Sequence, residues 1–252
     1  MARRLQERRS APRWQDIDLD TRNKFTLNGQ IELVDYFIST DSQSGDMNPT
    51  FYSSHVVDSF IEAVKRRQTN YYGITDFWLY TALDDHPVRG KDVAVIGSLQ
   101  PWYEAICLEF GGNPYTIEYN KIQTNDPRLN LTTLDEYRNN PRKFKAVFSI
   151  SSFEHDGLGR YGDPIDPEGD FRAMKEVKET FLEPGGLLYL GVPCGKDKLS
   201  FNAHRIYGNK RFNKLIEGFE IVDCYPRNFN EMLEVETGRS APQPIVVLRS
   251  KE

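Results

Sequence analysis

The sequence predicts a doubly wound α/β fold, in which helices cover both faces of a mostly parallel sheet. Apolar runs that suit buried strands, such as residues 93–96, alternate along the chain with stretches of helical apolar spacing. Residues 91–118 combine such a strand with a turn at Gly97, a helix entered at Pro101 and a second strand that ends in Glu118. Polar clusters follow the predicted strand ends, which is where an open parallel sheet binds its ligands. The pattern therefore favours an enzyme.

The N-terminal part of the chain shows weaker signals. Residues 1–24 are polar and aperiodic, so we expect a loosely docked arm. Asn28 and Gly29 separate two alternating runs, and because both residue types tolerate a positive φ, they predict a β-hairpin. Two helices are predicted next, at residues 53–68 and 74–83, from apolar residues that recur at helical spacing. These helices are expected to cover the open side of a cofactor site.

Beyond Glu118 the alternation of strands and helices continues. Pro184, Gly185 and Gly186 are expected to end one of the helices, because these residue types terminate helices. The long polar segments 153–170 and 194–208 are predicted as loops. The remaining predicted elements are strands near 128–132, 145–151, 187–193, 219–226 and 244–250, and helices at 133–140, 171–182 and 209–218.

Composition and charge argue against several classes of protein. A formal charge of −5 over 252 residues disfavours a general nucleic-acid-binding surface, and the five arginines within residues 1–13 are interpreted as a solvated basic tail. Cys107, Cys194 and Cys224 are far apart and lie in apolar runs, which indicates reduced core cysteines rather than a disulfide or zinc framework. The chain has no apolar run of membrane-spanning length and no signal-peptide core near its start, so we expect a cytoplasmic protein without a membrane span.

The turn at Gly97 and the acid at Glu118 indicate the class of cofactor. Glu118 follows Gly97 by 21 residues, close to the spacing at which a nucleotide-binding unit presents a carboxylate to ribose hydroxyls. The five residues after Gly97 include no second glycine, so a dinucleotide pyrophosphate would be poorly accommodated, and nicotinamide or flavin cofactors are disfavoured. S-adenosylmethionine has ribose hydroxyls but no phosphate, and it fits better. The alternative is an ordinary strand–helix–strand unit with an incidental glutamate.

Three further strings are specific enough to suggest a family: VIGSLQPWYEA (95–105), SISSFEHDGLGRYGDPIDPEGD (149–170) and VPCGKDKLSFNAHRIYG (192–208). Through them the chain resembles a family of unknown function, first catalogued from nematode proteins, within the class I S-adenosylmethionine-dependent methyltransferases. It implies S-adenosylmethionine as the cofactor and a Rossmann-like, seven-stranded sheet whose last strand is antiparallel. Residues 71–252 would form this methyltransferase domain, with residues 1–70 as an N-terminal arm, hairpin and helix packed on it. The candidate cofactor-binding residues are Gly97, Ser98, Pro101, Trp102, Glu118, Tyr119 and Ser151, although core packing is an equally good account of Trp102.

The acceptor side is expected on the loops that follow the fourth and fifth strands. His155 is the predicted general base for an alcohol acceptor, with Glu154 and Asp156 placed to orient it, to raise its basicity or to act in its place. His204 is the second candidate base, and an equally good interpretation is that it helps to hold the acceptor. The predicted substrate-binding residues are Arg160, Tyr161, Asp163, Arg205 and Tyr207.

Asp163, Asp166, Glu168 and Asp170 form a carboxylate cluster in the first of these loops. Oxygen ligands of this kind suit a divalent cation, but a solvated loop that leads to a helix cap at Asp170 is the favoured interpretation. Four glycines within 157–169 predict a pliable segment that would suit a lid.

We therefore predict an S-adenosylmethionine-dependent O-methyltransferase. The favoured acceptor is a sugar hydroxyl of a glycan or nucleotide sugar, because carboxylates, a histidine base and aromatic side chains suit a polyol and because the family is associated with glycan-processing settings. The alternative is a non-catalytic Rossmann-like binding module associated with glycan biosynthesis, with a glycosyltransferase as its partner. The sparse glycine turn favours this alternative, and neither function involves nucleic acid.

Overall fold

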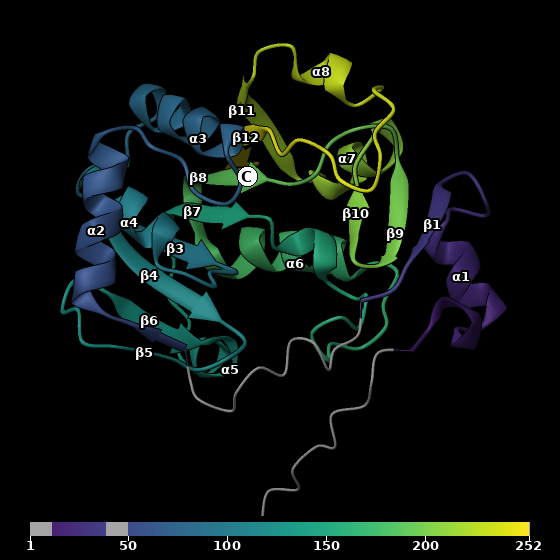
Figure 1. Cartoon of the computed structure of the whole chain (residues 1–252), viewed down its shortest axis with the longest axis horizontal. Coiled ribbons are helices and arrows are strands. Elements are labelled where there is room, and N and C mark those ends of the chain that lie inside the picture. Colours follow the sequence, from purple (N-terminus) through teal and green to yellow (C-terminus); the bar gives the residue numbers. More distant parts are fainter. Residues whose placement is uncertain (1–11, 39–49, 252) are drawn as a thin grey trace, which may run out of the picture.

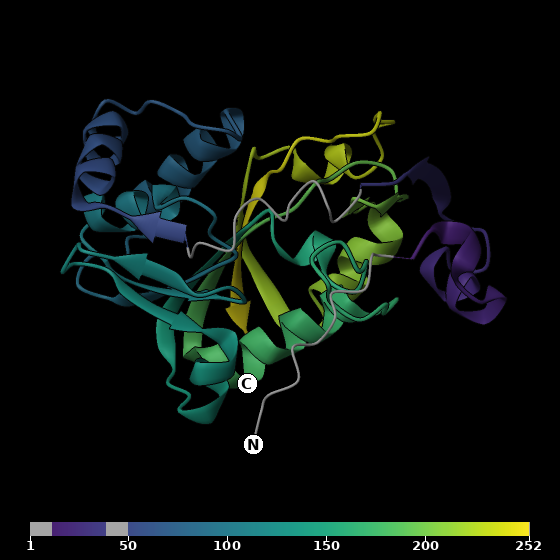
Figure 2. The ribbon, with the colours of Figure 1, turned by 60° about the horizontal axis from the view of Figure 1, so that its bottom comes forward.

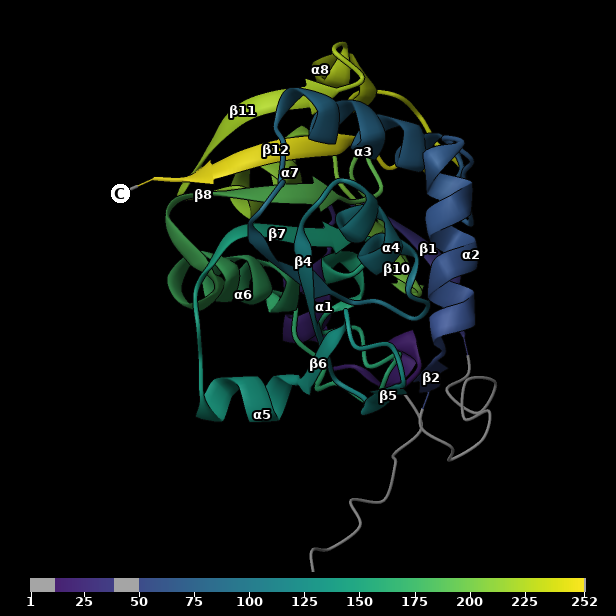
Figure 3. The ribbon, with the colours of Figure 1, turned by 90° about the vertical axis from the view of Figure 1, so that its left-hand side faces the viewer.

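A seven-stranded sheet forms the centre of the protein. The computed structural model describes residues 12–38 and 50–251. The strand order is β11-β12-β8-β7-β3-β4-β6, and every neighbouring pair is parallel except those of β12, which is antiparallel to β11 and to β8. Figure 3 shows these strands stacked from β11 to β6. The predicted doubly wound sheet with an antiparallel last strand is therefore confirmed. The strands are β3 (Asp92–Ile96), β4 (Asn113–Glu118), β6 (Asn130–Thr133), β7 (Phe144–Ile150), β8 (Leu182–Gly191), β11 (Phe219–Tyr225) and β12 (Ile245–Ser250).

Helices cover both faces of this sheet, as Figure 2 shows. One layer contains α2 (Ser54–Lys65), α3 (Ile74–Asp85) and α4 (Trp102–Glu109). The opposite layer contains α5 (Leu134–Asn139), α6 (Gly169–Glu176), α7 (Asn209–Leu215) and α8 (Phe229–Met232). These ranges agree with the predicted helices, apart from the short α8.

An apolar core lies on each face of the central sheet, and the alternation of side chains along the strands explains why there are two. On β12, Ile245 and Val247 pack against the α2–α4 layer, whereas Val246 and Leu248 pack against the α6–α7 layer. All four side chains are buried, because successive residues of a strand point to opposite faces and both faces are covered. This is why the sheet strands read as continuous apolar runs in the sequence.

The strand order reverses between β3 and β7. From β3 the chain continues outward to β4 and β6, and it then returns to the other side of β3 for β7 and β8. The carboxyl ends of the parallel strands point toward the small sheet at the right of Figure 1. An open α/β sheet binds its ligands at such a reversal, so the segments after β3 and β7 define the candidate site.

The N-terminal segment does not form the predicted hairpin. Residues before Asn28 instead form α1 (Leu19–Phe25), whose N-cap Asp18 accepts a hydrogen bond from the Thr21 amide at 2.9 Å. Asn28 and Gly29 do adopt positive φ, at 57° and 81°, but they end the helix. The second predicted hairpin strand is β1 (Glu32–Tyr36), which pairs in parallel with β9 far along the chain. Residues 1–11 of the predicted loosely docked arm lie outside the described residues, and most of residues 14–24 lie in helical turns.

Two further predictions about loops and helix ends were wrong. The segment predicted as a loop at 194–208 forms β9 (Lys198–Asn202) and β10 (His204–Ile206), which make a three-stranded sheet with β1. Pro184, Gly185 and Gly186 lie inside β8, where the register with β7 shifts between Phe144 and Ala146. The preceding helix has already ended in a π-helical turn at Val177–Phe181.

A further small sheet joins the N-terminal part to the loop after β4. The strand β2 (Thr50–Tyr52) pairs in parallel with β5 (Ile122–Thr124). None of the helices in the described ranges has the length and apolar composition needed to cross a lipid bilayer.

Candidate active site

Gly97 follows β3 at the point where the strand order reverses. Its φ is +76°, a left-handed conformation that glycine adopts without strain. A Cβ at this position would lie 2.5 Å from the Cβ of Ser152, which follows the adjacent strand β7. The absence of a side chain at Gly97 is therefore explained by the close approach of two strand ends, before any ligand is considered.

A buried hydrogen-bond network holds the residue after this glycine. Ser98 is 2% exposed, and its carbonyl oxygen accepts a hydrogen bond from the Tyr52 hydroxyl at 2.7 Å. The Ser98 Oγ lies 2.8 Å from the carbonyl oxygen of Gln100 and 2.9 Å from Oε2 of Glu104. Thr116 on β4 donates to the other oxygen of Glu104 at 2.7 Å. Burial raises the pKa of Glu104 to about 7.

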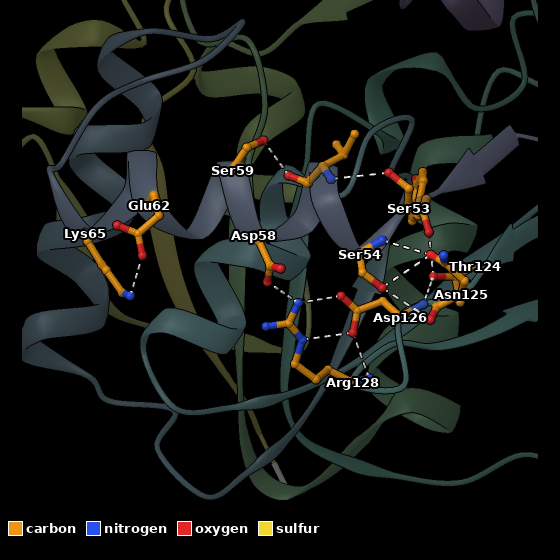
Figure 4. A network of polar contacts seen from close by, with 12 residues as sticks. Ser53, Ser54, Asp58, Ser59, Glu62, Lys65, Thr124, Asn125, Asp126 and Arg128 are labelled. Carbon is orange, nitrogen blue, oxygen red and sulfur yellow. Dashed lines mark hydrogen bonds and ion pairs between the residues drawn. The ribbon is translucent and has the colours of Figure 1, made fainter.

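Figure 4 shows how the segment that carries Tyr52 is fixed to the loop after β4. The Arg128 guanidinium contacts Asp58 on α2 at 2.6 Å and Asp126 at 2.5 Å. Ser54, at the start of α2, donates its amide to the side chain of Asn125 at 2.9 Å. These contacts anchor α2 and β2 beside the β3 turn.

Glu118 is the last residue of β4 and is half-buried, as expected for an acid at a strand tip. Its Oε1 accepts a hydrogen bond from the Tyr119 amide at 2.7 Å. Burial raises the pKa of the Glu118 carboxyl, although hydrogen bonds from the backbone of Tyr119, Asn120 and Ser98 oppose this shift. The structure therefore brings Glu118 and the Gly97–Ser98 turn together at the ends of neighbouring strands.

The segment after β7 begins with a strained residue. Ser151 has a φ of +54°, which is uncommon for a residue with a side chain. Its Oγ donates to Oε1 of Glu154 at 2.6 Å and accepts from Nε2 of Gln243 at 3.1 Å. Glu154 is fully buried, and burial raises its pKa to about 7. Strained backbone of this kind is concentrated at functional sites.

Three buried polar atoms beside Ser151 have no hydrogen-bond partner among the described residues. They are Oε2 of Glu154, the hydroxyl of Tyr103 and Oε1 of Gln243. Glu154 and Gln243 both bond the Ser151 hydroxyl, Gln243 is bound through its main-chain carbonyl oxygen to Thr75 at the start of α3, and Tyr103 interacts electrostatically with Glu154. Because buried polar atoms are almost always hydrogen-bonded, these atoms indicate a polar ligand or water at this position.

His155 lies next to this region, and one of its ring nitrogens is hydrogen-bonded to the backbone. Its Nδ1 is 2.6 Å from the carbonyl oxygen of Ala203, so Nδ1 carries the proton and donates it. Its Nε2 lies 3.5 Å from Oε1 of Glu154. Burial lowers the pKa of His155 to about 4, so the ring is neutral near pH 7 and Nε2 has a free lone pair. Asp163 raises the pKa of His155, but burial outweighs it, so the ring does not gain the basicity predicted from its acidic neighbours.

His204 and Asp156 are close to His155 but make different contacts. The His204 ring centroid is 6.3 Å from that of His155, and its Nε2 is 2.7 Å from the carbonyl oxygen of Arg239. Burial lowers the pKa of His204 and raises that of Asp156. The Asp156 carbonyl oxygen accepts a hydrogen bond from Arg205 at 2.6 Å. The structure thus gathers the four predicted catalytic residues, His155, Glu154, Asp156 and His204, in one place.

Arg205 and Tyr207 do not fit their predicted substrate-binding role, because both side chains are fully buried. The Arg205 guanidinium donates to the carbonyl oxygens of Glu154, Asp156 and Asp166, and it thereby fixes the loop that carries His155. The Tyr207 hydroxyl donates to Asp170 at 3.0 Å.

Hydrogen bonds hold the loop after His155 in place, in contrast to the pliable segment that was predicted. Asp163 accepts hydrogen bonds from the amides of Gly157 (2.7 Å), Gly159 (3.1 Å) and Tyr161 (3.2 Å). A Cβ at Gly157 would collide with the carbonyl oxygen of Asp166. Gly157 thus allows the close approach of the segment at Asp166. Asp163 binds the amides of its own loop instead of facing a substrate.

The carboxylates of the predicted cluster point to separate partners. Asp170 is fully buried beside Arg211 (2.8 Å), Glu168 pairs with Lys214 (2.8 Å) and Asp166 pairs with Arg172. The cap of α6 is Glu168, so the prediction of Asp170 as a helix cap was wrong. Within the described part of the chain, no group of three or more such side chains is arranged to hold a metal ion.

The other predicted site residues lie around this region in different environments. Trp102 is buried, with its ring edge-on to Phe60 of α2 at 5.3 Å, and Pro101 is the buried N-cap of α4. Core packing therefore accounts for Trp102. Tyr119 and Tyr161 are 64% and 50% exposed, and each lies at a strand or loop end beside the site.

Sequence reasoning missed Tyr52, Glu104 and Gln243. Tyr52 and Gln243 reach the site only through long-range contacts, and no local pattern marks them. Glu104 had a signal, because it is an acid between Tyr103 and Ala105 in a helix whose other acid, Glu109, lies at its end.

Comparison with known proteins identifies the family. A family model described as a Caenorhabditis protein of unknown function, DUF268, matches residues 90–247. The chain belongs to this family. All three strings that carried the resemblance lie within the matched range, so that prediction is confirmed.

Two of the similar solved structures come from bacteria. One is the 1,6-didemethyltoxoflavin-N1-methyltransferase of Burkholderia thailandensis with bound 1,6-didemethyltoxoflavin and S-adenosylhomocysteine, at 15% identity and a TM-score of 0.48 over 78% of this chain and 87% of that one. Another is a TehB-like S-adenosylmethionine-dependent methyltransferase from Corynebacterium glutamicum, at 12% identity and a TM-score of 0.46 over 79% of this chain and 97% of that one. Similarity at this level does not indicate the reaction of the DUF268 chain. No curated protein matches its sequence.

Proposed function

We propose that this DUF268 protein is a methyltransferase that uses S-adenosylmethionine and methylates an oxygen atom. The observation that carries the proposal is the neutral His155, whose Nδ1 is bound to the Ala203 carbonyl oxygen while Nε2 remains free beside Glu154. A neutral imidazole held in this tautomer is suited to remove a proton from a hydroxyl. S-adenosylmethionine supplies the methyl group.

The residues at the strand reversal fit this donor. Glu118 ends β4 with a half-buried carboxylate that can accept hydrogen bonds from two ribose hydroxyls. The free oxygens of Glu154 and Gln243 suit the amino group of the methionine end, and the free Tyr103 hydroxyl suits its carboxylate. The turn after β3 has one glycine, which is sufficient for a donor without phosphate groups.

His155 and Glu154 have distinct roles in the proposed reaction. His155 Nε2 takes the hydroxyl proton while the acceptor oxygen attacks the methyl group. Glu154, 3.5 Å away, stabilises the imidazolium that forms. Arg205 positions both residues by binding the carbonyl oxygens of Glu154 and Asp156.

The favoured acceptor is a sugar hydroxyl of a glycan or nucleotide sugar. A polyol suits carboxylates and a neutral base, and the exposed rings of Tyr161 and Tyr71 can pack against a sugar face. A glycosyltransferase partner and a cytoplasmic location belong to the same proposal, as does the division into an N-terminal part and a methyltransferase domain at residue 71.

Calorimetry with S-adenosylmethionine and S-adenosylhomocysteine tests the donor. We expect saturable binding that Glu118→Ala weakens by at least about tenfold, because a charge-assisted hydrogen bond contributes about 1.5–3 kcal/mol. His155→Ala should bind the donor normally and lose methyl transfer by about 10²–10⁴-fold. The absence of binding at millimolar ligand would overturn the proposal.

One observation favours a second function, a non-catalytic binding module associated with glycan biosynthesis. Ser152 packs directly against Gly97, so the glycine alone is no evidence of a bound cofactor. This alternative predicts no heat with either adenosyl ligand but retained binding to nucleotide sugars or glycans. Mass spectrometry of sugar acceptors after incubation with S-adenosylmethionine separates the two functions, because only the enzyme adds the mass of a methyl group.

A further inference from the structure

Glu104 is a carboxyl group that the proposed reaction does not use, and it lies fully buried in α4. No ion pair involves it among residues 12–38 and 50–251. Four titratable groups interact electrostatically with Glu104. They are Tyr103 and Cys107 on its own helix, Tyr52 on β2 and Glu118 at the end of β4. All four are neutral or negative, so nothing nearby compensates a charge on Glu104.

The hydroxyl protons available around Glu104 indicate its protonation state. The Ser98 hydroxyl has one proton but two close oxygen neighbours, the Gln100 carbonyl oxygen at 2.8 Å and Glu104 Oε2 at 2.9 Å, besides the Tyr52 hydroxyl at 3.4 Å. The proton of Tyr52 is used on the Ser98 carbonyl oxygen, and the proton of Thr116 is used on Glu104 Oε1. If Oε2 carries a proton, it donates to Ser98 Oγ, which then donates to Gln100. Only in this state does each of the two short contacts of Ser98 Oγ contain a proton, although the Gln100 carbonyl oxygen also accepts from the Trp102 amide at 2.7 Å.

We infer that Glu104 is protonated in the folded protein and that its proton holds the turn from Gly97 to Gln100 in the shape that receives the methyl donor. The second half of this inference rests on the proposed function. Loss of the proton leaves the Ser98 hydroxyl with two competing acceptors, and it puts a negative charge near Glu118 on the neighbouring strand. Glu104 is therefore a positioning residue that links donor binding to pH.

Burial places this change near neutral pH, since it raises the pKa of Glu104 to about 7. The affinity for S-adenosylhomocysteine should fall about fivefold between pH 6 and pH 8.5, the effect of losing one hydrogen bond. The variant Glu104→Gln should lack this fall and retain only the pH dependence that Glu154 contributes, because its amide group donates to Ser98 and accepts from Thr116 without titrating. Glu104→Ala should bind S-adenosylhomocysteine weakly at both pH values.

Glu109→Gln is the matched control, because Glu109 ends the same helix and is not fully buried. It should retain the pH dependence of the natural chain. The inference is overturned if Glu104→Gln loses affinity as Glu104→Ala does, or if it retains the full pH dependence of the natural chain.

A measurement without ligand separates this inference from the proposed function. In protein labelled with ¹³C at the glutamate carboxyl groups, the NMR signal that disappears in Glu104→Gln should report a protonated acid at pH 6. The amide signals of Leu99 and Gln100 should shift with the same midpoint as that carboxyl signal. An ionised Glu104 at pH 6, or amide signals that do not follow it, contradicts the inference even if the donor binds. Absence of donor binding with both NMR results intact contradicts the proposed function alone.

Discussion

The hydroxyl of Tyr52 donates a hydrogen bond to the main-chain carbonyl oxygen of Ser98 across 2.7 Å. Tyr52 belongs to the short strand β2, whereas Ser98 follows the first strand of the central sheet. Because β2 is paired with β5 and α2 is anchored to Asn125 and Arg128, the tyrosine is held in place from two sides. The N-terminal part of the chain therefore shapes the turn on which donor binding is proposed to depend.

Tyr52→Phe should lower the affinity for S-adenosylhomocysteine by about fivefold, because the Ser98 carbonyl oxygen loses its buried partner. Its cost in the free energy of unfolding should be about 1 kcal/mol. Calorimetry and urea denaturation measure the two effects. Tyr80→Phe is the control, since the Tyr80 hydroxyl makes a comparable bond to the Gln68 carbonyl oxygen at 2.6 Å. It should destabilise to a similar degree and leave binding unchanged; equal loss of binding in both variants contradicts the prediction.

Gly97→Ala should destabilise the fold by two separate effects. The positive φ costs an alanine about 1–2 kcal/mol, and the contact with Ser152 adds about 1–3 kcal/mol of strain. Gly29→Ala isolates the first effect, because Gly29 has a φ of +81° and a Cβ added there would meet no atom within 4 Å. Denaturant titration of both variants should show the larger loss at Gly97. Equal losses would mean that Ser152 moves away without cost.

Stability should decrease as pH rises from about 4.5 to about 7. The pKa of Glu154 is raised by burial from an ordinary value of 4.5 to about 7 in the folded chain, so folding favours the protonated acid. Its contribution is complete below about pH 4.5 and is lost as pH rises through about 7, to a total on the order of 3 kcal/mol. Unfolding curves at a series of pH values should therefore be flatter for Glu154→Gln than for the natural chain. Identical pH profiles would show that Glu154 is already ionised in the folded state.

Asp170→Ala should destabilise the protein by about 3–5 kcal/mol, because it leaves the buried guanidinium groups of Arg205 and Arg211 without a counter-charge. Glu168→Ala, two residues earlier, removes the exposed pair with Lys214 and should cost at most about 1 kcal/mol. Thermal and denaturant unfolding compare the two. A small effect at Asp170 would mean that water reaches the two arginines.

The central sheet was predictable because its signals are local. Strands such as β3 and β7 are buried on both faces, so each is a continuous apolar run that can be located in the sequence. The face of α2 that carries Val57 and Val64 is marked in the same way by helical spacing. The seven strands with an antiparallel last strand followed from the family resemblance, whereas the strand order came from the structure.

The hairpin prediction failed because its signal was local while the pairing partners of the flanking residues are distant in sequence. Asn28 and Gly29 specify a reversal with positive φ, but they do not specify which elements flank it. Phe25 packs with Phe201 at a ring distance of 6.0 Å, and β1 pairs with β9 more than a hundred residues later. These contacts favour a helix before the turn and a parallel pairing after it.

By itself the sequence determined the sheet, the helix layers, the position of Glu118 at a strand tip and the gathering of His155 with its neighbours after β7, because each depends on patterns within a few residues. Only the tertiary structure decided that Arg205 and Tyr207 are internal, that Tyr52 and Glu104 hold the Ser98 turn, and that Ser152 fills the space at Gly97. Burial and hydrogen-bond partners are properties of the packed chain, and residues distant in sequence supply them.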